Sequence, residues 1–84
     1  MAPRRIVFTR HAEDMLAERK IERVWVESTV RDPENVENDP SGSNLLRAYR
    51  RIPERRGLWL RVVYEPVDDV MKIVTVFFDR GYKS

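Results

Sequence analysis

The chain has 84 residues, of which 42% are hydrophobic and 36% charged, a composition that fits one small domain over residues 1–84. The longest strongly apolar run, residues 73–78, is far shorter than the roughly 20 residues of a membrane-spanning helix, so a membrane protein is excluded. The chain has no cysteine for disulfides and no apolar signal core near its start, so we expect a cytoplasmic protein.

Positive charge is concentrated in the second half of the chain. Residues 1–44 carry 7 basic and 9 acidic groups, whereas residues 45–84 carry 9 and 5. Residues 47–61 alone contain six arginines against one acid, Glu54, a local net charge of +5. Arginine binds phosphate bidentately and stacks on rings, so this cluster, with Tyr49 and Trp59 among it, points to RNA or DNA as a partner.

The first half of the chain predicts a short strand and two helices. Residues 5–8 form a β-type run, and Thr9 is a suitable N-cap for a helix over residues 10–19. A second helix is expected over about residues 22–31, because Asp32 precedes a proline and therefore avoids the α conformation. Residues 34–44, with Pro40-Ser41-Gly42-Ser43, are expected to form a loop.

The second half alternates with period two and predicts strands over residues 45–52, 58–65 and 71–79, with turns at 53–57 and 66–70 and a tail at 80–84. Helices followed by such a meander predict an α+β domain. We expect two N-terminal helices packed on one face of a three- to four-stranded antiparallel sheet.

Alternation also assigns side chains to the two faces of the sheet. The face toward the helices is expected to carry an apolar set: Leu58, Leu60, Val62, Tyr64, Val74, Val76 and Phe78. The open face is expected to carry Trp59, Arg61, Val63, Ile73, Thr75, Phe77 and Asp79. Arg47, Tyr49 and Arg51 are assigned to the open face as well, since burying unpaired arginines is costly; a one-residue bulge would invert part of this assignment.

Two sets of residues are candidates for chemistry. His11, the only histidine, is a candidate general acid or base, and the alternative is a local hydrogen bond at the start of the first helix. Metal-independent phosphodiester cleavage needs cations at the phosphate, which Arg61 could supply with Arg51, Arg80 and Tyr82 around it. The alternative is a solvated face whose arginines pair with acids: Glu54, Glu65 and Asp79.

Neither a metal nor a cofactor is expected. One histidine and no cysteine leave only carboxylates as ligands, and the acidic groups at residues 34–39 and 68–69 lack calcium-loop spacing. The sequence also contains no phosphate-cradling glycine-rich loop.

Several short motifs, in this order and spacing, closely resemble a family of small prokaryotic domains of unknown function. They are Thr9-x-His11-Ala12, Met15, Glu18-Arg19-x-Ile21, Val26, Asp32-Pro33-Glu34, Leu60-Arg61-Val62-Val63-Tyr64 and Val74-Thr75-Val76-Phe77-x-Asp79-Arg80. That family looks like a relative of the RelE/ParE/BrnT toxin superfamily, which has two helices on an antiparallel sheet. The chain departs from the pattern at Lys20, where the family usually has a glycine suited to a left-handed helix cap.

The resemblance implies a RelE-like fold and a choice of activities. Several RelE-like members are metal-independent, ribosome-associated mRNA interferases, whereas ParE-like members act on gyrase. The resemblance therefore implies RNA or the ribosome and a cognate antitoxin as partners. It also makes five residues at pattern positions candidates for function: His11, Arg19, Arg61, Asp79 and Arg80. A His11–Asp79 or Arg19–Asp79 contact that only stabilises the fold is the alternative for these residues.

Two functions follow as hypotheses. In the first, a toxin-like domain binds RNA and cleaves it without metal. Arg61 and Arg80 would stabilise the phosphate and His11 or Tyr82 would move the proton. The binding residues would be Arg19, Arg47, Tyr49, Arg51, Trp59 and Asp79. In the second, the same face belongs to a non-catalytic module that binds protein or nucleic acid. Residues 73–78 would mediate a homodimer if they form an exposed edge, but a central strand would have the same composition.

Overall fold

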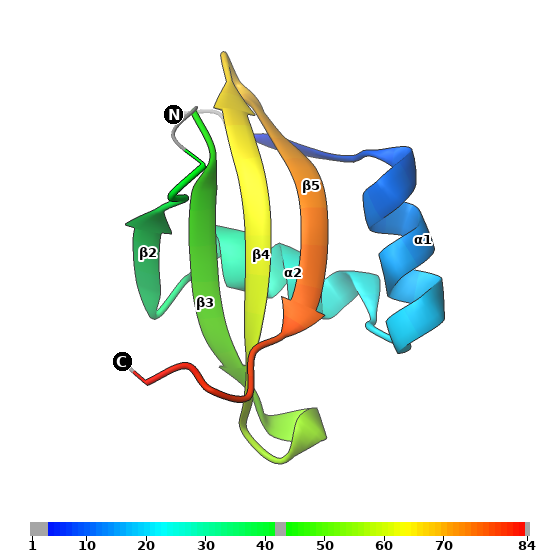
Figure 1. Ribbon diagram of the computed structural model, residues 1–84. Helices are drawn as coiled ribbons and strands as arrows, with labels where there is room; N and C mark the ends of the chain where they lie inside the picture. Colours follow the sequence, from blue (N-terminus) through cyan, green and yellow to red (C-terminus); the bar gives the residue numbers. More distant parts are fainter. Residues whose placement is uncertain (1–3, 42–43, 84) are drawn as a thin grey trace.

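The computed structural model describes residues 4–41 and 44–83, in which one strand is followed by two helices and then by a run of four strands (Figure 1). The elements are β1 (Arg5–Phe8), α1 (Arg10–Arg19), α2 (Arg23–Arg31), β2 (Asn35–Asn38), β3 (Leu46–Ile52), the short 3₁₀ turn η1 (Pro53–Arg55), β4 (Leu58–Val67) and β5 (Val70–Phe78).

The sheet has five strands in the order β1-β5-β4-β3-β2, and β1 runs parallel to β5 while the other pairs are antiparallel. The prediction of a three- to four-stranded antiparallel sheet is therefore wrong, although the α+β class is right. The parallel pair arises because β1 adds to the free side of β5, with the Arg5 N–H donating to Asp69 O and the Thr9 N–H to Ile73 O, at 2.9 and 3.0 Å.

Strand β2 corrects the predicted loop over residues 34–44. Its sequence, Asn-Val-Glu-Asn, has no apolar alternation, and three of its four residues are exposed. The segment is extended because it pairs with the outer side of β3, from Asn35 opposite Tyr49 to Asn38 opposite Leu46. Residues 42 and 43 of the predicted loop, and Ser84 of the predicted tail, lie outside the described residues.

The helix predictions are confirmed. Thr9 caps α1, and its hydroxyl accepts from the Ala12 N–H at 3.1 Å. Lys20 ends the helix in the left-handed conformation, with φ 54°, so it adopts the backbone that a glycine would take more easily.

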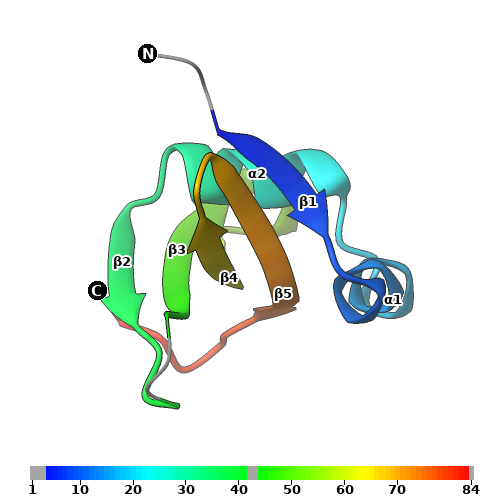
Figure 2. The ribbon, with the colours of Figure 1, turned by 90° about the horizontal axis from the view of Figure 1, so that it is seen from above.

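The core lies between the sheet and the helices. Helix α2 crosses behind β3 and β4, and α1 lies along β5 (Figures 1 and 2). Both helices contribute to one cluster of buried side chains, and its members are Ala12, Leu16, Ile21, Trp25, Val26, Val30, Ala48, Ile52, Leu60, Val62, Tyr64, Met71, Ile73 and Val76.

A bulge changes the face assignment of β5. Val63 lies opposite Thr75, but the next residue, Tyr64, lies opposite Ile73, so Val74 is the extra residue. Ile73 is consequently fully buried in the core. The predicted positions of Ile73 and Val74 are wrong because the bulge reverses the alternation before residue 75, whereas Val76 in the core is as predicted.

The segment that follows β5 crosses the open face. It runs on the side of the sheet opposite α2 and ends beside β2 (Figures 1 and 2). Strand β5 lies between β1 and β4, but β1 pairs only with its first half, from Val70 to Ile73, so within the described residues the β1 side of residues 74–78 has no strand partner. No helix within residues 4–41 and 44–83 is long and apolar enough to cross a membrane.

Candidate functional site

Arg61 lies at the centre of the open face and is largely covered. Its side chain is 19% exposed and forms an ion pair with the Asp79 carboxylate, between Nη2 and Oδ2. The guanidinium carbon lies 4.7 Å from the Phe77 ring centroid and 5.5 Å from that of Tyr49. Asp79 is itself held, because its Oδ1 accepts from the Gly81 N–H at 3.1 Å. Arg61 is thus part of a packed cluster.

Three rings form what we call the aromatic platform: Tyr49, Trp59 and Tyr82. The Tyr82 ring stacks on Tyr49 with centroids 3.7 Å apart and planes at 8°, and Trp59 meets Tyr82 edge-on at 4.9 Å. The Tyr82 hydroxyl accepts a hydrogen bond from the Asn35 side-chain amide of β2. Tyr49 is only 1% exposed, whereas Trp59 and Tyr82 are half-buried and present part of their rings to solvent.

Arg51 extends the platform at the side of β2. Its guanidinium carbon lies 5.3 Å from the Trp59 ring centroid. The Glu34 carboxylate accepts from Arg51 Nη2 at 2.8 Å and Nε at 3.1 Å, and from the Arg51 backbone N–H at 2.8 Å. The Arg51 side-chain bonds, and then its backbone bond, lower the pKa of Glu34. The carboxylate therefore fixes Arg51 while the arginine side chain stays 60% exposed.

The structure neutralises part of the positive charge that the sequence concentrates in residues 47–61. Arg47 Nε donates to Asp39 Oδ2 at 3.1 Å, and Arg50 Nη1 donates to Asp32 Oδ2 at 3.2 Å. Asp39 also accepts from the Ser41 N–H at 2.9 Å, and hydrogen bonding by Ser41 and then by Arg47 lowers its pKa to about 2. Acids of residues 32–39 thus compensate much of the charge counted over residues 47–61.

The two candidate residues of α1 lie at the rim of this face beside β5. His11 is exposed, and its Nε2 lies 3.2 Å from Thr75 Oγ1. The Arg19 guanidinium carbon lies 5.8 Å from the Phe77 ring centroid. Neither residue bonds Asp79, whose carboxylate oxygens are bound by Arg61 and Gly81 within the described part of the chain. The alternative contacts His11–Asp79 and Arg19–Asp79 are therefore not formed.

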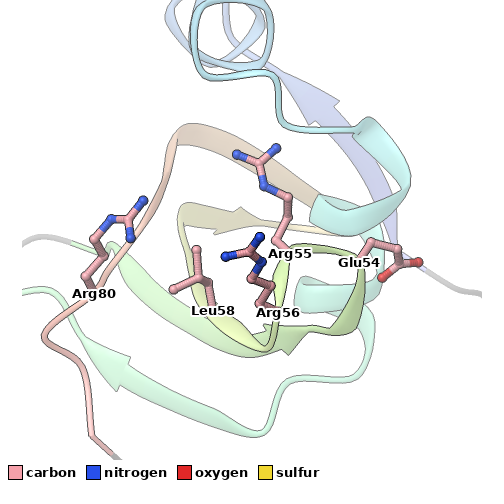
Figure 3. A pocket seen from close by; sticks show the side chains of 5 residues that line it. All are labelled: Glu54, Arg55, Arg56, Leu58 and Arg80. Carbon is pink, nitrogen blue, oxygen red and sulfur yellow. The ribbon is translucent and has the colours of Figure 1, made fainter.

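Arg80 lies apart from the Arg61 cluster. It lines a pocket of about 300 Å³ at the end of the sheet, together with Glu54, Arg55 and Arg56 of the turn before β4 and with Leu58, the first residue of β4 (Figure 3). Of the four predicted catalytic residues, Arg61 and Tyr82 therefore share one cluster through Tyr49. His11 lies at the rim of that cluster's face, and Arg80 lines a separate pocket.

Sequence reasoning did not single out Asn35, Arg55 or Arg56. Arg55 and Arg56 were included in the charge count, but the sequence does not indicate which residues the side chains of a turn will contact. Among residues 4–41 and 44–83, no group of three or more histidine, aspartate or glutamate side chains is arranged to hold a metal ion.

Comparison with known proteins gives a family but no function. No curated protein and no solved structure matches the chain significantly. A family model described as a domain of unknown function, DUF4258, matches residues 8–78, which include both helices and the whole β3–β5 meander. The chain therefore belongs to the DUF4258 family.

Proposed function

We propose that this domain binds single-stranded RNA on its open face, with unpaired bases stacking on the aromatic platform. The observation that carries the proposal is the arrangement of Trp59, Tyr82 and Arg51, two half-buried rings beside an exposed guanidinium. Unpaired bases stack on aromatic side chains and on arginine planes, and each base–aromatic stack contributes about 1–3 kcal/mol.

The packing beneath the rings supports this role. Tyr82 rests on Tyr49, and its hydroxyl is bonded to Asn35, so its ring is fixed before any ligand arrives. Arg51 is fixed by Glu34 in the same way. A platform whose side chains are already ordered loses little conformational entropy on binding, which favours affinity. In the RelE-like interpretation of the sequence, ribosome-bound mRNA would be the substrate and an antitoxin would cover this face.

RNA cleavage without metal is a second candidate, favoured by the position of His11. Its imidazole is exposed at the rim of the same face and lies within hydrogen-bond distance of the Thr75 hydroxyl. As a general base it would take the proton of a ribose 2′-hydroxyl. The 2′-oxygen would then attack the adjacent phosphorus and expel the 5′-oxygen, which takes up a proton, leaving a 2′,3′-cyclic phosphate.

The two tryptophans make a direct test of binding. Trp59 is in the platform, whereas Trp25 is buried in the core at 8% exposure. We expect single-stranded RNA to quench the fluorescence of the native chain and of Trp25→Phe, but not that of Trp59→Phe. Quenching that persists in folded Trp59→Phe, or RNA that leaves the native spectrum unchanged, would contradict the proposed face.

Cleavage is tested by incubating the native chain with a long RNA in EDTA. His11→Ala and, as a matched control, Arg10→Ala are compared with it, since both side chains are exposed on the first turn of α1. Products with cyclic phosphate ends from the native chain and Arg10→Ala, but not from His11→Ala, support the activity. If the RNA stays intact, the assay is repeated on translating ribosomes, and intact mRNA there would rule it out.

A further inference from the structure

The pocket at the end of the sheet, which we call the arginine pocket, is formed by Arg55, Arg56, Arg80 and Leu58. None of its three arginines has an acidic ion-pair partner within residues 4–41 and 44–83. The fifth lining residue, Glu54, directs its carboxylate away from the arginines (Figure 3). Three positive groups thus border one hollow without a counter-charge from the described chain.

The turn between β3 and β4 fixes two of these arginines. Arg56 has φ 59° and donates its N–H to Pro53 O at 3.1 Å, and Gly57 follows with φ 73°. A left-handed arginine is unfavourable compared with glycine, so the fold holds this side chain at the pocket against a local preference. Arg55 is held by Phe78 and Trp25, whose ring centroids lie 5.1 and 5.8 Å from its guanidinium carbon.

Arg80 comes to the same pocket from β5. The residue before it, Asp79, is anchored by its N–H to Trp59 O at 2.8 Å, and the chain turns there toward the open face. In Figure 3 its guanidinium points toward Leu58 and the turn arginines. The three arginines line the same pocket, so an anion that binds in it gains from their positive charge.

We infer that the arginine pocket binds the terminal phosphate of an RNA strand, an inference that rests on the proposed function. A phosphate monoester carries about −1.5 to −2 charges at pH 7, whereas a diester inside a strand carries one, so three arginines match the monoester better. The volume of about 300 Å³ is large enough for the phosphate and its ribose, and Leu58 gives the sugar an apolar wall.

The position of the pocket relative to the platform supports RNA as the source of the phosphate. Leu58 of the pocket directly precedes Trp59 of the platform, and Arg80 directly follows Asp79 of the Arg61 cluster. A strand whose bases stack on the platform can therefore place its end in the pocket as it passes around the end of the sheet.

The test compares one RNA sequence in three forms: with a 5′-phosphate, with a 3′-phosphate, and with hydroxyls at both ends. We expect one phosphorylated form to bind the native chain about tenfold more tightly than the hydroxyl form, the effect of one set of charge-assisted hydrogen bonds. The advantage should disappear in Arg56→Gln and Arg80→Gln and persist in Arg31→Gln, which removes an exposed arginine outside the pocket. Thermal unfolding of each variant verifies its fold.

The possible results separate the two proposals. Equal binding of all three RNAs by the native chain would overturn the pocket inference and leave the proposed function intact. Failure of every form to bind would overturn the proposed function. A phosphoserine peptide that binds the native chain as tightly as the phosphorylated RNA, and loses affinity in Arg56→Gln, would overturn the assignment of the pocket to RNA. Inorganic phosphate should compete only for the terminal-phosphate advantage, and competition that also removes hydroxyl-ended RNA would contradict separate sites.

Discussion

The open face and the arginine pocket use the same residue type in opposite ways. On the open face, Arg51 and Arg61 are each bound by a carboxylate, and Arg47 is bound by Asp39 at its edge. In the pocket, Arg55 meets aromatic rings and a backbone carbonyl, and none of the three lining arginines, Arg55, Arg56 and Arg80, has an ion-pair partner within the described residues. The carboxylates fix the side chains of the first group, whereas the second group is available to an anion.

The difference also exists within the paired group. Arg61 and Asp79 are 19% and 16% exposed, so each would be left poorly solvated without the other. Arg51 and Glu34 are more exposed, and pairs of that kind contribute little to stability. Removing an arginine is therefore expected to change stability by different amounts at the centre of the open face, at its edge and in the pocket.

The largest effect is expected at Arg61. Arg61→Ala leaves the Asp79 carboxylate unpaired and removes the group packed between Tyr49 and Phe77, so the free energy of unfolding should fall by about 3 kcal/mol. Urea unfolding measures this change. The double variant Arg61→Ala/Asp79→Ala should lose less than the sum of the two single variants.

This prediction also sets a limit on functional tests. If Arg61→Ala retained native stability, the ion pair would not hold the fold, and the contrast between paired and free arginines would fail. If the expected loss occurs, absence of RNA binding in Arg61→Ala does not identify a binding residue. Arg51→Gln is the better probe of the face, because its side chain is exposed.

A smaller effect is expected when two pocket arginines are removed together. In Arg56→Gln/Arg80→Gln, the slope of log K for phosphate-ended single-stranded RNA against log salt should become shallower by roughly 0.7, the contribution of the one phosphate that the pocket no longer neutralises. Arg47→Gln/Arg50→Gln removes the same charge from paired arginines and should leave the slope nearly unchanged. Equal changes in both double variants would show that the pairing in the structure does not govern which arginines meet RNA.

The sequence was sufficient to predict the local structure of this fold but not the pairing of its strands. Thr9 and Pro33 marked the start of α1 and the end of α2, because capping and proline act within a few residues. Strand β2 could not be recognised, since asparagine is depleted in strands and the segment is extended only through its contact with β3. The bulge at Val74 likewise depends on how β4 and β5 align, and no residue type announces it.

The candidate site was predictable to the same extent. Alternation placed Tyr49, Trp59 and Arg61 on one face, and the alternative to a catalytic site had named Asp79 among the acids that pair with arginine. The carboxylates of residues 32–39 come from a segment predicted as a helix end and a loop, so their neutralising effect was not foreseen. The pocket depends on left-handed Arg56 and on the turn after Asp79, which are conformations and not patterns.

Two glycine substitutions separate the destabilising effect of a left-handed backbone from the role of the side chain in the pocket. Lys20 and Arg56 both have positive φ, and only Arg56 lines the arginine pocket. Lys20→Gly should raise the free energy of unfolding by about 1 kcal/mol, and the melting temperature by roughly 5 °C. Arg56→Gly should gain less, because two adjacent glycines increase the entropy of the unfolded chain.

Binding is the second measurement on the same two variants. Arg56→Gly should lose the preference for a terminal phosphate although its stability does not fall, and Lys20→Gly should keep that preference. A stabilised Arg56→Gly with native phosphate preference would mean that the side chain has no part in the pocket. A loss of stability in both variants would contradict the backbone conformations themselves.

The smallest effect is expected on the stability of the fold at acidic pH, through Asp39. Hydrogen bonding by Ser41 and Arg47 lowers the pKa of this carboxyl from 3.8 to about 2 in the folded chain, so folding favours its ionised form. The resulting stabilisation is present above pH 4 and is lost as the pH falls from about 4 to 2, because the unfolded chain takes up the proton first. Asp39→Asn should therefore flatten the stability profile in that window and leave the profile between pH 5 and 7 parallel to that of the native chain.

Glu34→Gln is the matched variant, since the pKa of Glu34, at the other end of β2, is also lowered by hydrogen bonds from an arginine. If neither substitution changes the acid limb, these pairs do not hold their carboxylates ionised, and Arg47 and Arg51 would count among the free arginines of the open face.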